Sequence, residues 1–154
     1  MKLYDHVAAT LLGRVLLGAI FLASGLNKAV NPDATQAYMQ AMGMTWATSL
    51  WYLAAIVSEI GGGLSLILGV WARLGAALLM LFLIPATVIF HGNLADPNQL
   101  IHAMKNLAIT GGLLYIWTYG PGPLSIDRRT AWPAQAEAGD ARLNQPSNVG
   151  RRAG

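Results

Sequence analysis

Four apolar stretches, each close to twenty residues long, make up most of this 154-residue chain. They cover about residues 7–27, 47–70, 72–91 and 101–119. An α-helix of roughly 20 apolar residues crosses the hydrocarbon core of a bilayer, so each stretch has the length of a membrane span. The composition agrees, because only 11% of the residues are charged, against about 25% in an ordinary soluble domain. The pattern predicts an all-α protein, a four-helix transmembrane bundle.

Proline residues and short corners predict the boundaries between these spans. The first span is expected to end before Asn31 and Pro32, because proline disfavours a helical conformation in the residue before it. Residues 33–42 are expected to form a short interfacial helix between spans 1 and 2. Only residues 71–73 separate the second span from the third, which predicts a tight antiparallel hairpin. A turn at residues 92–100 is expected before the last span.

The chain is expected to fall into two parts. Residues 1–127 form the four-span membrane domain in this interpretation, and residues 128–154 form a basic, flexible tail. The tail lacks the apolar periodicity needed to build a core, so we expect it to be disordered in isolation. The first 28 residues resemble a signal peptide, but Arg14 interrupts the apolar run and no clear cleavage site follows. We therefore expect a first span that is retained.

The distribution of positive charge predicts an orientation. Four spans would place both termini on one side of the membrane, with Lys2, Arg73 and Arg128, whereas the other side would hold only Lys28 and Lys105. Because lysine and arginine are more frequent on the cytoplasmic side, both termini are expected to be cytoplasmic. No interleaved pattern of basic and aromatic residues supports binding to nucleic acid.

Arg14 and Glu59 place charge inside the first two predicted spans, where an unpaired charge is costly. Counted from the ends of two antiparallel spans, their depths differ by only about 5 Å at a rise of 1.5 Å per residue. The two residues are therefore predicted to form a structural ion pair. In the alternative interpretation, Glu59 is a proton-accepting group controlled by Arg14.

Six polar or ionisable residues are expected to gather toward the extracytoplasmic face. They are Asn27, Lys28, His91, His102, Lys105 and Asn106. Lysine and histidine donors beside apolar helix surfaces suit a ligand with carbonyl oxygens and an apolar tail, which is the shape of a quinone. This group predicts a quinone-type ligand site. The structural alternative is that the lysines extend to the membrane interface and the histidines cap helix ends.

Other cofactors and catalytic motifs find little support. The chain has no cysteine, which excludes disulfides, iron–sulfur clusters and thiolate ligation of haem by this chain. Two histidines without a third ligand do not make a metal site, so no metal and no haem are predicted. No phosphate-binding loop, nucleophile elbow or zinc-protease helix is present. Whether the chain is an enzyme is left open; at most it is a quinone-linked oxidoreductase subunit.

Small residues recur at four-residue steps in two of the spans. Gly61, Ser65 and Gly69 follow each other in the second span, and Ala108 precedes Gly112 in the fourth. Such strips let helices approach closely in membranes. We expect them to serve helix packing, either within one chain or between chains.

Several motifs taken together resemble the DoxX family of small membrane proteins. They are Gly13-Arg14, Gly25-Leu26-Asn27-Lys28, Glu59-Ile60-Gly61-Gly62-Gly63, Lys105-Asn106-Leu107 and Gly111-Gly112-Leu113-Leu114. The resemblance covers about residues 8–128. It implies a four-helix integral protein of the bacterial inner membrane. Some members are associated with quinone-linked sulfur oxidation, terminal quinol oxidation or membrane oxidoreductive-stress complexes, and many have no assigned activity.

The function expected from these features is that of an integral membrane subunit of a redox or respiratory assembly with a quinone as ligand. The first alternative is a non-catalytic structural or assembly subunit of a larger membrane complex. The second is a small proton-linked transporter with Glu59 as the proton carrier. The expected partners are membrane lipids and either other membrane-protein subunits or further copies of this chain.

Overall fold

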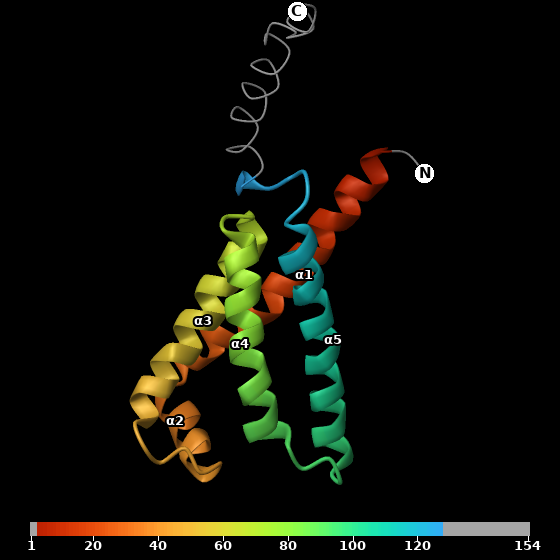
Figure 1. Cartoon of the computed structure of the whole chain (residues 1–154). Coiled ribbons are helices and arrows are strands. Elements are labelled where there is room, and N and C mark those ends of the chain that lie inside the picture. Colours follow the sequence, from red (N-terminus) through yellow and green to blue (C-terminus); the bar gives the residue numbers. More distant parts are fainter. Residues whose placement is uncertain (1–2, 128–154) are drawn as a thin grey trace, which may run out of the picture.

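The computed structural model describes residues 3–127, and this part of the chain is built from helices alone. The helices are α1 (Leu3–Val30), α2 (Pro32–Ala41), α3 (Thr48–Leu68), α4 (Ala72–His91) and α5 (Pro97–Tyr119) (Figure 1). The predicted all-α class is confirmed for these residues. The predicted tail, residues 128–154, lies outside the described residues.

Three of the described helices are long and apolar enough to cross a membrane. The qualifying segments are Val7–Val30 within α1, Thr48–Leu68 and Ala72–His91. α5 has a comparable length of 23 residues, but polar side chains near its start make it less apolar, and it is not among these candidates. Length and composition therefore support three of the four predicted spans.

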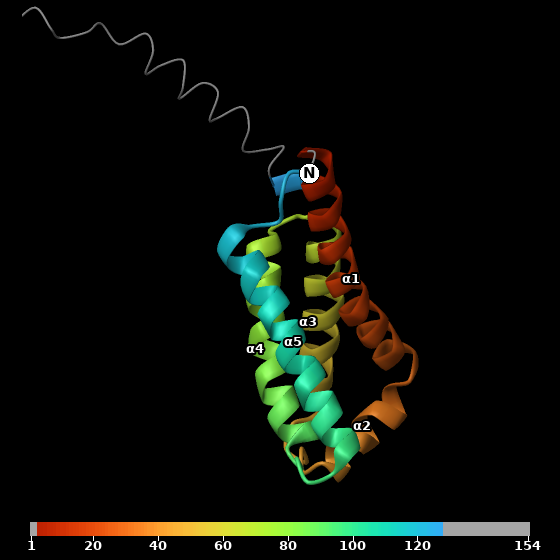
Figure 2. The ribbon, with the colours of Figure 1, turned by 90° about the vertical axis from the view of Figure 1, so that its right-hand side faces the viewer.

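The four long helices lie side by side, with α2 at one end of them (Figures 1 and 2). α1 packs along α3, α3 along α4 and α4 along α5, whereas α1 and α5 touch only briefly. The N-terminal part of α1, the α3–α4 corner and the end of α5 lie together at what we call the terminal end. The opposite end, which we call the α2 end, holds α2 and the α4–α5 turn.

α5 begins earlier than the sequence pattern suggested. The side chain of Asp96 accepts a hydrogen bond from the backbone N–H of Asn98 at 2.8 Å, and Pro97 occupies the first helical position. Both are favourable at a helix start, because an aspartate side chain satisfies a free N–H group and proline needs no partner for one. The predicted turn at residues 92–100 is therefore shorter than expected.

α3 and α4 form the tight antiparallel hairpin that the sequence predicted. α3 ends at Leu68 and α4 begins at Ala72. Gly69 and Trp71 adopt the left-handed conformation, with φ of 69° and 48°. The backbone N–H groups of Trp71 and Ala72 donate to the carboxylate of Asp127 at 2.7 and 2.9 Å. The segment after α5 thus supplies the acceptor for the first N–H groups of α4.

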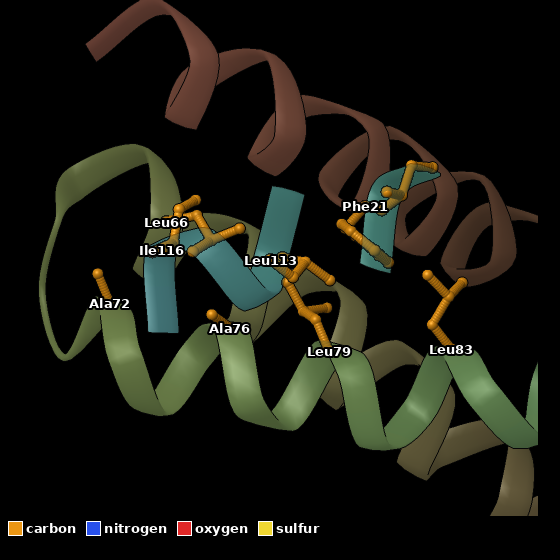
Figure 3. Close-up of a cluster of buried hydrophobic side chains, with 9 residues drawn as sticks. Phe21, Leu66, Ala72, Ala76, Leu79, Leu83, Leu113 and Ile116 are labelled. Atoms are coloured by element: carbon orange, nitrogen blue, oxygen red, sulfur yellow. The ribbon is translucent and has the colours of Figure 1, made fainter. Parts of the chain in front are cut away.

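A cluster of buried apolar side chains fills the bundle from the terminal end to its middle (Figure 3). The cluster consists of Phe21, Leu66, Ala72, Ala76, Leu79, Leu83, Ile109, Leu113 and Ile116. These residues come from all four long helices, and Leu66, Leu79 and Leu113 are completely buried. One core therefore joins the long helices in this half.

The backbones of α1 and α3 come into direct contact at two glycines. A Cβ atom on Gly18 would lie 2.7 Å from the carbonyl oxygen of Gly63, and one on Gly63 would lie 2.8 Å from that of Gly18. Neither position has room for a side chain. Close approach through small residues is the usual way in which membrane helices gain packing contacts.

One residue of the predicted packing strip, Gly61, does not pack against a neighbouring helix. Gly61 faces open space, whereas Gly62 packs against Leu79 of α4 and Gly63 against α1. Each helical residue is rotated by about 100° from the previous one, so counting glycines at four-residue steps can select the neighbouring face. The other predicted members lie inside the chain: Ser65 contacts Gly75, Gly69 lies against Arg14 and Ser125, and Gly112 contacts Leu17.

Candidate functional site

Arg14 is buried at the terminal end, where it binds backbone carbonyl groups. Its Nη1 donates to the carbonyl oxygen of Pro121 at 2.8 Å, and its Nη2 donates to that of Leu124 at 2.8 Å and that of Ile67 at 3.4 Å. Only 3% of the residue is exposed. One arginine therefore ties α1 to the end of α3 and to the segment after α5.

This position corrects the predicted ion pair between Arg14 and Glu59. Glu59 lies opposite Gly25 of α1, since a Cβ atom on Gly25 would be 3.1 Å from the Cβ of Glu59. Arg14 is about eleven residues earlier, or roughly 16 Å away along the helix. The error came from measuring depth from the ends of the apolar stretches, because the observed register is set by glycine contacts between α1 and α3.

Glu59 is instead paired with Lys28. The Nζ of Lys28 lies 2.8 and 3.0 Å from the two carboxylate oxygens. The hydroxyl of Ser24 accepts from Lys28 at 2.7 Å and donates to Glu59 at 3.1 Å, which closes a three-residue network. Glu59 is only 4% exposed, and its carboxylate accepts two hydrogen bonds from Lys28 and one from Ser24, as a buried charge requires.

This network forms part of the wall of a cavity of about 540 Å³ in the half of the bundle near α2. All five helices contribute to the lining, which is mostly apolar. The apolar lining includes Phe21, Met39, Ala55, Phe82, Leu83 and Ile89. Apolar walls with a few convergent polar groups are typical of sites for small organic ligands, and such sites commonly measure about 300–1,000 Å³.

Four of the six residues predicted to form a ligand site line this cavity. They are Lys28, His91, Lys105 and Asn106. Asn27 and His102 are not among the lining residues. The side-chain oxygen of Asn27 accepts a hydrogen bond from Asn31 at 3.2 Å, at an exposed position. Asn27 lies on the outer side of α1, one residue away from the face that carries Lys28.

Asn106 is buried, and its amide has a defined orientation. The hydroxyl of Thr87 donates to the carbonyl oxygen of Leu83 at 2.7 Å, so its oxygen acts as acceptor toward the amide nitrogen of Asn106 at 3.0 Å. A hydroxyl has only one hydrogen to give. The side-chain carbonyl oxygen and the second side-chain N–H of Asn106 are therefore available to a ligand at the cavity wall.

His91, His102 and Lys105 form a connected group beside the cavity. The imidazole rings of His91 and His102 stack with centroids 4.9 Å apart. Lys105 Nζ lies 3.2 Å from Nδ1 of His102, and Nδ1 of His91 lies 2.7 Å from the side-chain oxygen of Gln99. Because an ammonium only donates and an amide oxygen only accepts, Nδ1 is the acceptor in His102 and the donor in His91. His102 therefore contacts Lys105 and His91, which line the cavity, without lining it itself.

Several residues around the cavity were missed by the sequence analysis. Ser24 and Thr87 orient Lys28, Glu59 and Asn106 through hydroxyl groups. Ser24 lies one helical turn before Lys28, so its spacing was a usable signal. α2 also contributes to the lining, and the ring of its Tyr38 stacks on Phe90 of α4 with centroids 5.5 Å apart. Tyr38 and Phe90 are far apart in the sequence, so the local spacing of residues did not predict this contact.

The chain is similar to several bacterial membrane proteins. It is 36% identical over 128 residues to the inner membrane protein YqjF of Escherichia coli, covering 83% of this chain and 95% of the relative. It is 31% identical over 139 residues to the inner membrane protein YphA of the same organism, covering 84% of this chain and 98% of the relative. An uncharacterized membrane protein of Mycobacterium tuberculosis is 29% identical over 134 residues, covering 80% of this chain and 82% of that protein.

The sequence profile of the DoxX family matches residues 9–92, which include most of α1, all of α2 to α4, and the Lys28–Glu59 network. No solved structure matches the chain significantly. The family match, the relatives and the apolar helices agree with one another. The chain is a membrane protein that belongs to the DoxX family.

Proposed function

We propose that this protein is an integral subunit of a redox or respiratory assembly in the bacterial inner membrane, and that its cavity binds a quinone-type ligand. The cavity of about 540 Å³ is the observation that carries this proposal. The protein would supply a binding site for a mobile redox cofactor. The electrons would come from, and pass to, other subunits.

The walls of the cavity suit an amphipathic ring with an apolar chain. Lys105 and Asn106 can donate hydrogen bonds to carbonyl oxygens of a head group. Phe82, Ile89 and Leu81 offer apolar surface for the chain. A ligand pocket of this kind uses the apolar wall for affinity and the few polar groups for orientation.

We also propose that α5 crosses the membrane as a fourth span. It packs along α4, and Leu113 and Ile116 belong to the shared core. Its outer surface carries large apolar side chains, among them Leu107, which is 73% exposed. Its polar residues Lys105 and Asn106 lie at the cavity. A helix with a buried polar residue such as Asn106 and large apolar side chains on its outer surface is suited to lipid.

Both termini are proposed to be cytoplasmic. The terminal end carries Arg73, and Lys2 and Arg128 directly adjoin segments that lie there. Lysine and arginine favour the cytoplasmic side. Exposed aromatic residues mark both ends, with Trp71 and Tyr119 at the terminal end and Trp46 near α2, as expected at membrane interfaces. The cavity would then lie in the extracytoplasmic half.

The direct test is the quinone content of protein extracted with a mild detergent, measured by chromatography and mass spectrometry. The wild type is expected to retain close to one quinone per chain. Ala86→Phe fills the cavity from α4, and we expect it to lose most of that quinone. Val88→Phe is the matched control, because Val88 is on the same helix, is 70% exposed and does not line the cavity.

The outcomes of this experiment separate the proposed functions. Quinone that is absent from the wild type, or equal in Ala86→Phe and Val88→Phe, would refute the proposed site. Co-purification of other membrane subunits without any quinone would favour the structural or assembly role instead. The same preparation therefore tests the ligand and identifies the partners.

A further inference from the structure

The two lysines that line the cavity differ in how their charge is compensated. Lys28 is paired with Glu59 at 2.8 Å, and the hydroxyl of Ser24 joins the pair. Lys105 has no carboxylate within 4.0 Å among the described residues, and its nearest polar partner is Nδ1 of His102 at 3.2 Å. One wall of the cavity is therefore neutral and the other carries a net positive charge.

The remaining polar groups do not cancel this charge. The titratable groups that line the cavity are Lys28 from α1, Tyr38 from α2, Glu59 from α3, His91 from α4 and Lys105 from α5. With neutral histidine and tyrosine, two lysines and one glutamate leave one positive charge. Lys105 is exposed at the margin of this mostly apolar cavity, so its charge is accessible to a ligand that enters there. A bound anion would pair with this charge.

We infer that Lys105, together with Asn106, makes the cavity selective for an amphiphile whose head group carries a single negative charge. Lys105 lies on the exposed margin of the cavity, so it can reach an incoming ligand. The free N–H of the Asn106 amide is the second donor, held in place by Thr87. Charge-assisted hydrogen bonds of this kind are about twice as strong as neutral ones.

This inference rests on the proposed function and names the charge state that the site prefers. A quinone-type ligand would be held most tightly when its oxygen atoms carry one negative charge, as in an ionised hydroxyquinone. A long-chain carboxylate shares this chemistry, since it also places one negative charge on oxygen atoms at the end of an apolar chain. The ligand's head group would lie at the α5 wall and its chain against α4.

The test compares two probes that share the naphthoquinone ring and the alkyl chain but differ in charge. A 2-hydroxy-3-alkyl-1,4-naphthoquinone is ionised at neutral pH, and its 2-methoxy derivative is uncharged. Binding is measured in nanodiscs of zwitterionic lipid by quenching of tryptophan fluorescence, since Trp51 lines the cavity. Empty nanodiscs correct for partitioning into lipid. We expect the wild type to bind the anionic probe about tenfold more tightly than the neutral one.

Lys105→Gln is expected to reduce this preference to within about twofold, because it weakens binding of the anionic probe more than binding of the methoxy probe. Arg73→Gln, which removes an exposed cation of α4 that does not line the cavity, should keep the full preference. Equal binding of both probes by the wild type, or a preference that survives in Lys105→Gln, would overturn the inference.

A second probe pair, decanoate and decanol, separates this inference from the quinone assignment. Lys105-dependent binding of decanoate without binding of either naphthoquinone would support the anion site and refute the quinone ligand. Retention of native quinone, with no preference for the charged member of either probe pair, would support the quinone ligand and refute the anion site. Failure of all four probes to bind would contradict both the anion site and the quinone ligand.

Discussion

The two halves of this bundle handle polar side chains in different ways. In the terminal half, the buried Arg14 donates hydrogen bonds to carbonyl groups of Pro121, Leu124 and Ile67. In the half near α2, the buried Glu59 accepts hydrogen bonds from Lys28 and Ser24, and the helices line a cavity.

The two halves also differ in how closely their helices approach one another. Where α1 and α3 meet through Gly18 and Gly63, their backbones touch. Nearer to α2, side chains from α2 and α4 contribute to the wall of the cavity. The terminal half would fix the helix arrangement, so that the other half can hold an open space.

The largest expected effect tests the ion pair between Lys28 and Glu59 in the half of the bundle that contains the cavity. Glu59→Leu would leave Lys28 without its partner in the bundle, and we expect a loss of about 3–5 kcal/mol in the free energy of unfolding. The double variant Lys28→Met with Glu59→Leu should recover most of this loss, since no charge remains to be buried. Denaturant titration in detergent measures both. Equal destabilisation of the single and double variants would contradict the ion-pair account.

The next effect tests the terminal half. Arg14→Met removes the donors for Pro121 and Leu124, and we expect a loss of about 3 kcal/mol, because hydrogen bonds to a charged group are among the stronger ones. Arg73→Met is the control, since the contact of Arg73 with the carbonyl oxygen of Thr118 is 3.4 Å long and exposed. Thermal unfolding of the two variants gives the comparison. A loss no larger in Arg14→Met than in Arg73→Met would refute the anchoring role.

A smaller effect tests the close contact of α1 with α3. Gly63→Ala would place a Cβ atom 2.8 Å from a backbone oxygen, and we expect a loss of about 2 kcal/mol from overpacking. Gly61→Ala should be neutral or stabilising by up to about 1 kcal/mol, because its side chain enters open space. The melting temperature of Gly63→Ala should fall below that of the wild type, and the melting temperature of Gly61→Ala should stay the same or rise. The reverse order would show that Gly61 is the packing residue after all.

The smallest expected effect concerns the orientation of Asn106. Thr87→Val removes the acceptor for the Asn106 amide, and we expect a loss of about 1 kcal/mol in stability together with weaker binding of the ligand. Thr118→Val is the matched control, because its hydroxyl also donates to a carbonyl four residues earlier but lies far from the cavity. Ligand retention that is unchanged in Thr87→Val would remove Asn106 from the binding account.

Much of the fold could be predicted from the apolar stretches and from the proline and glycine residues between them. The helix boundaries around Pro32 and the hairpin at Gly69 were predictable, because proline and glycine act locally. The start of α5 was misplaced because Asp96 and Pro97 are as common in turns as at helix starts. The fourth predicted span, α5, is not among the candidate spans of the structure, because polar residues near its start make it less apolar.

The candidate site was predicted in part. The three- and four-residue spacing of an α-helix predicted that His102, Lys105 and Asn106 share one face, and Lys105 and Asn106 of these three line the cavity. The pairing of Glu59 depended on the register between α1 and α3, which is set by contacts of Gly18 with Gly63 and cannot be read from the depth of single residues. The contribution of α2 depended on a tertiary contact, the stacking of Tyr38 on Phe90.

The most direct test of this account is an experimentally determined structure of the wild-type protein in lipid nanodiscs, without added ligand. The account predicts density for an amphipathic molecule in the cavity near α2, with its head within hydrogen-bonding distance of Lys105 and Asn106 and with Lys28 paired to Glu59. A cavity closed by side chains, or one that shows the same density as the lipid outside, would contradict it.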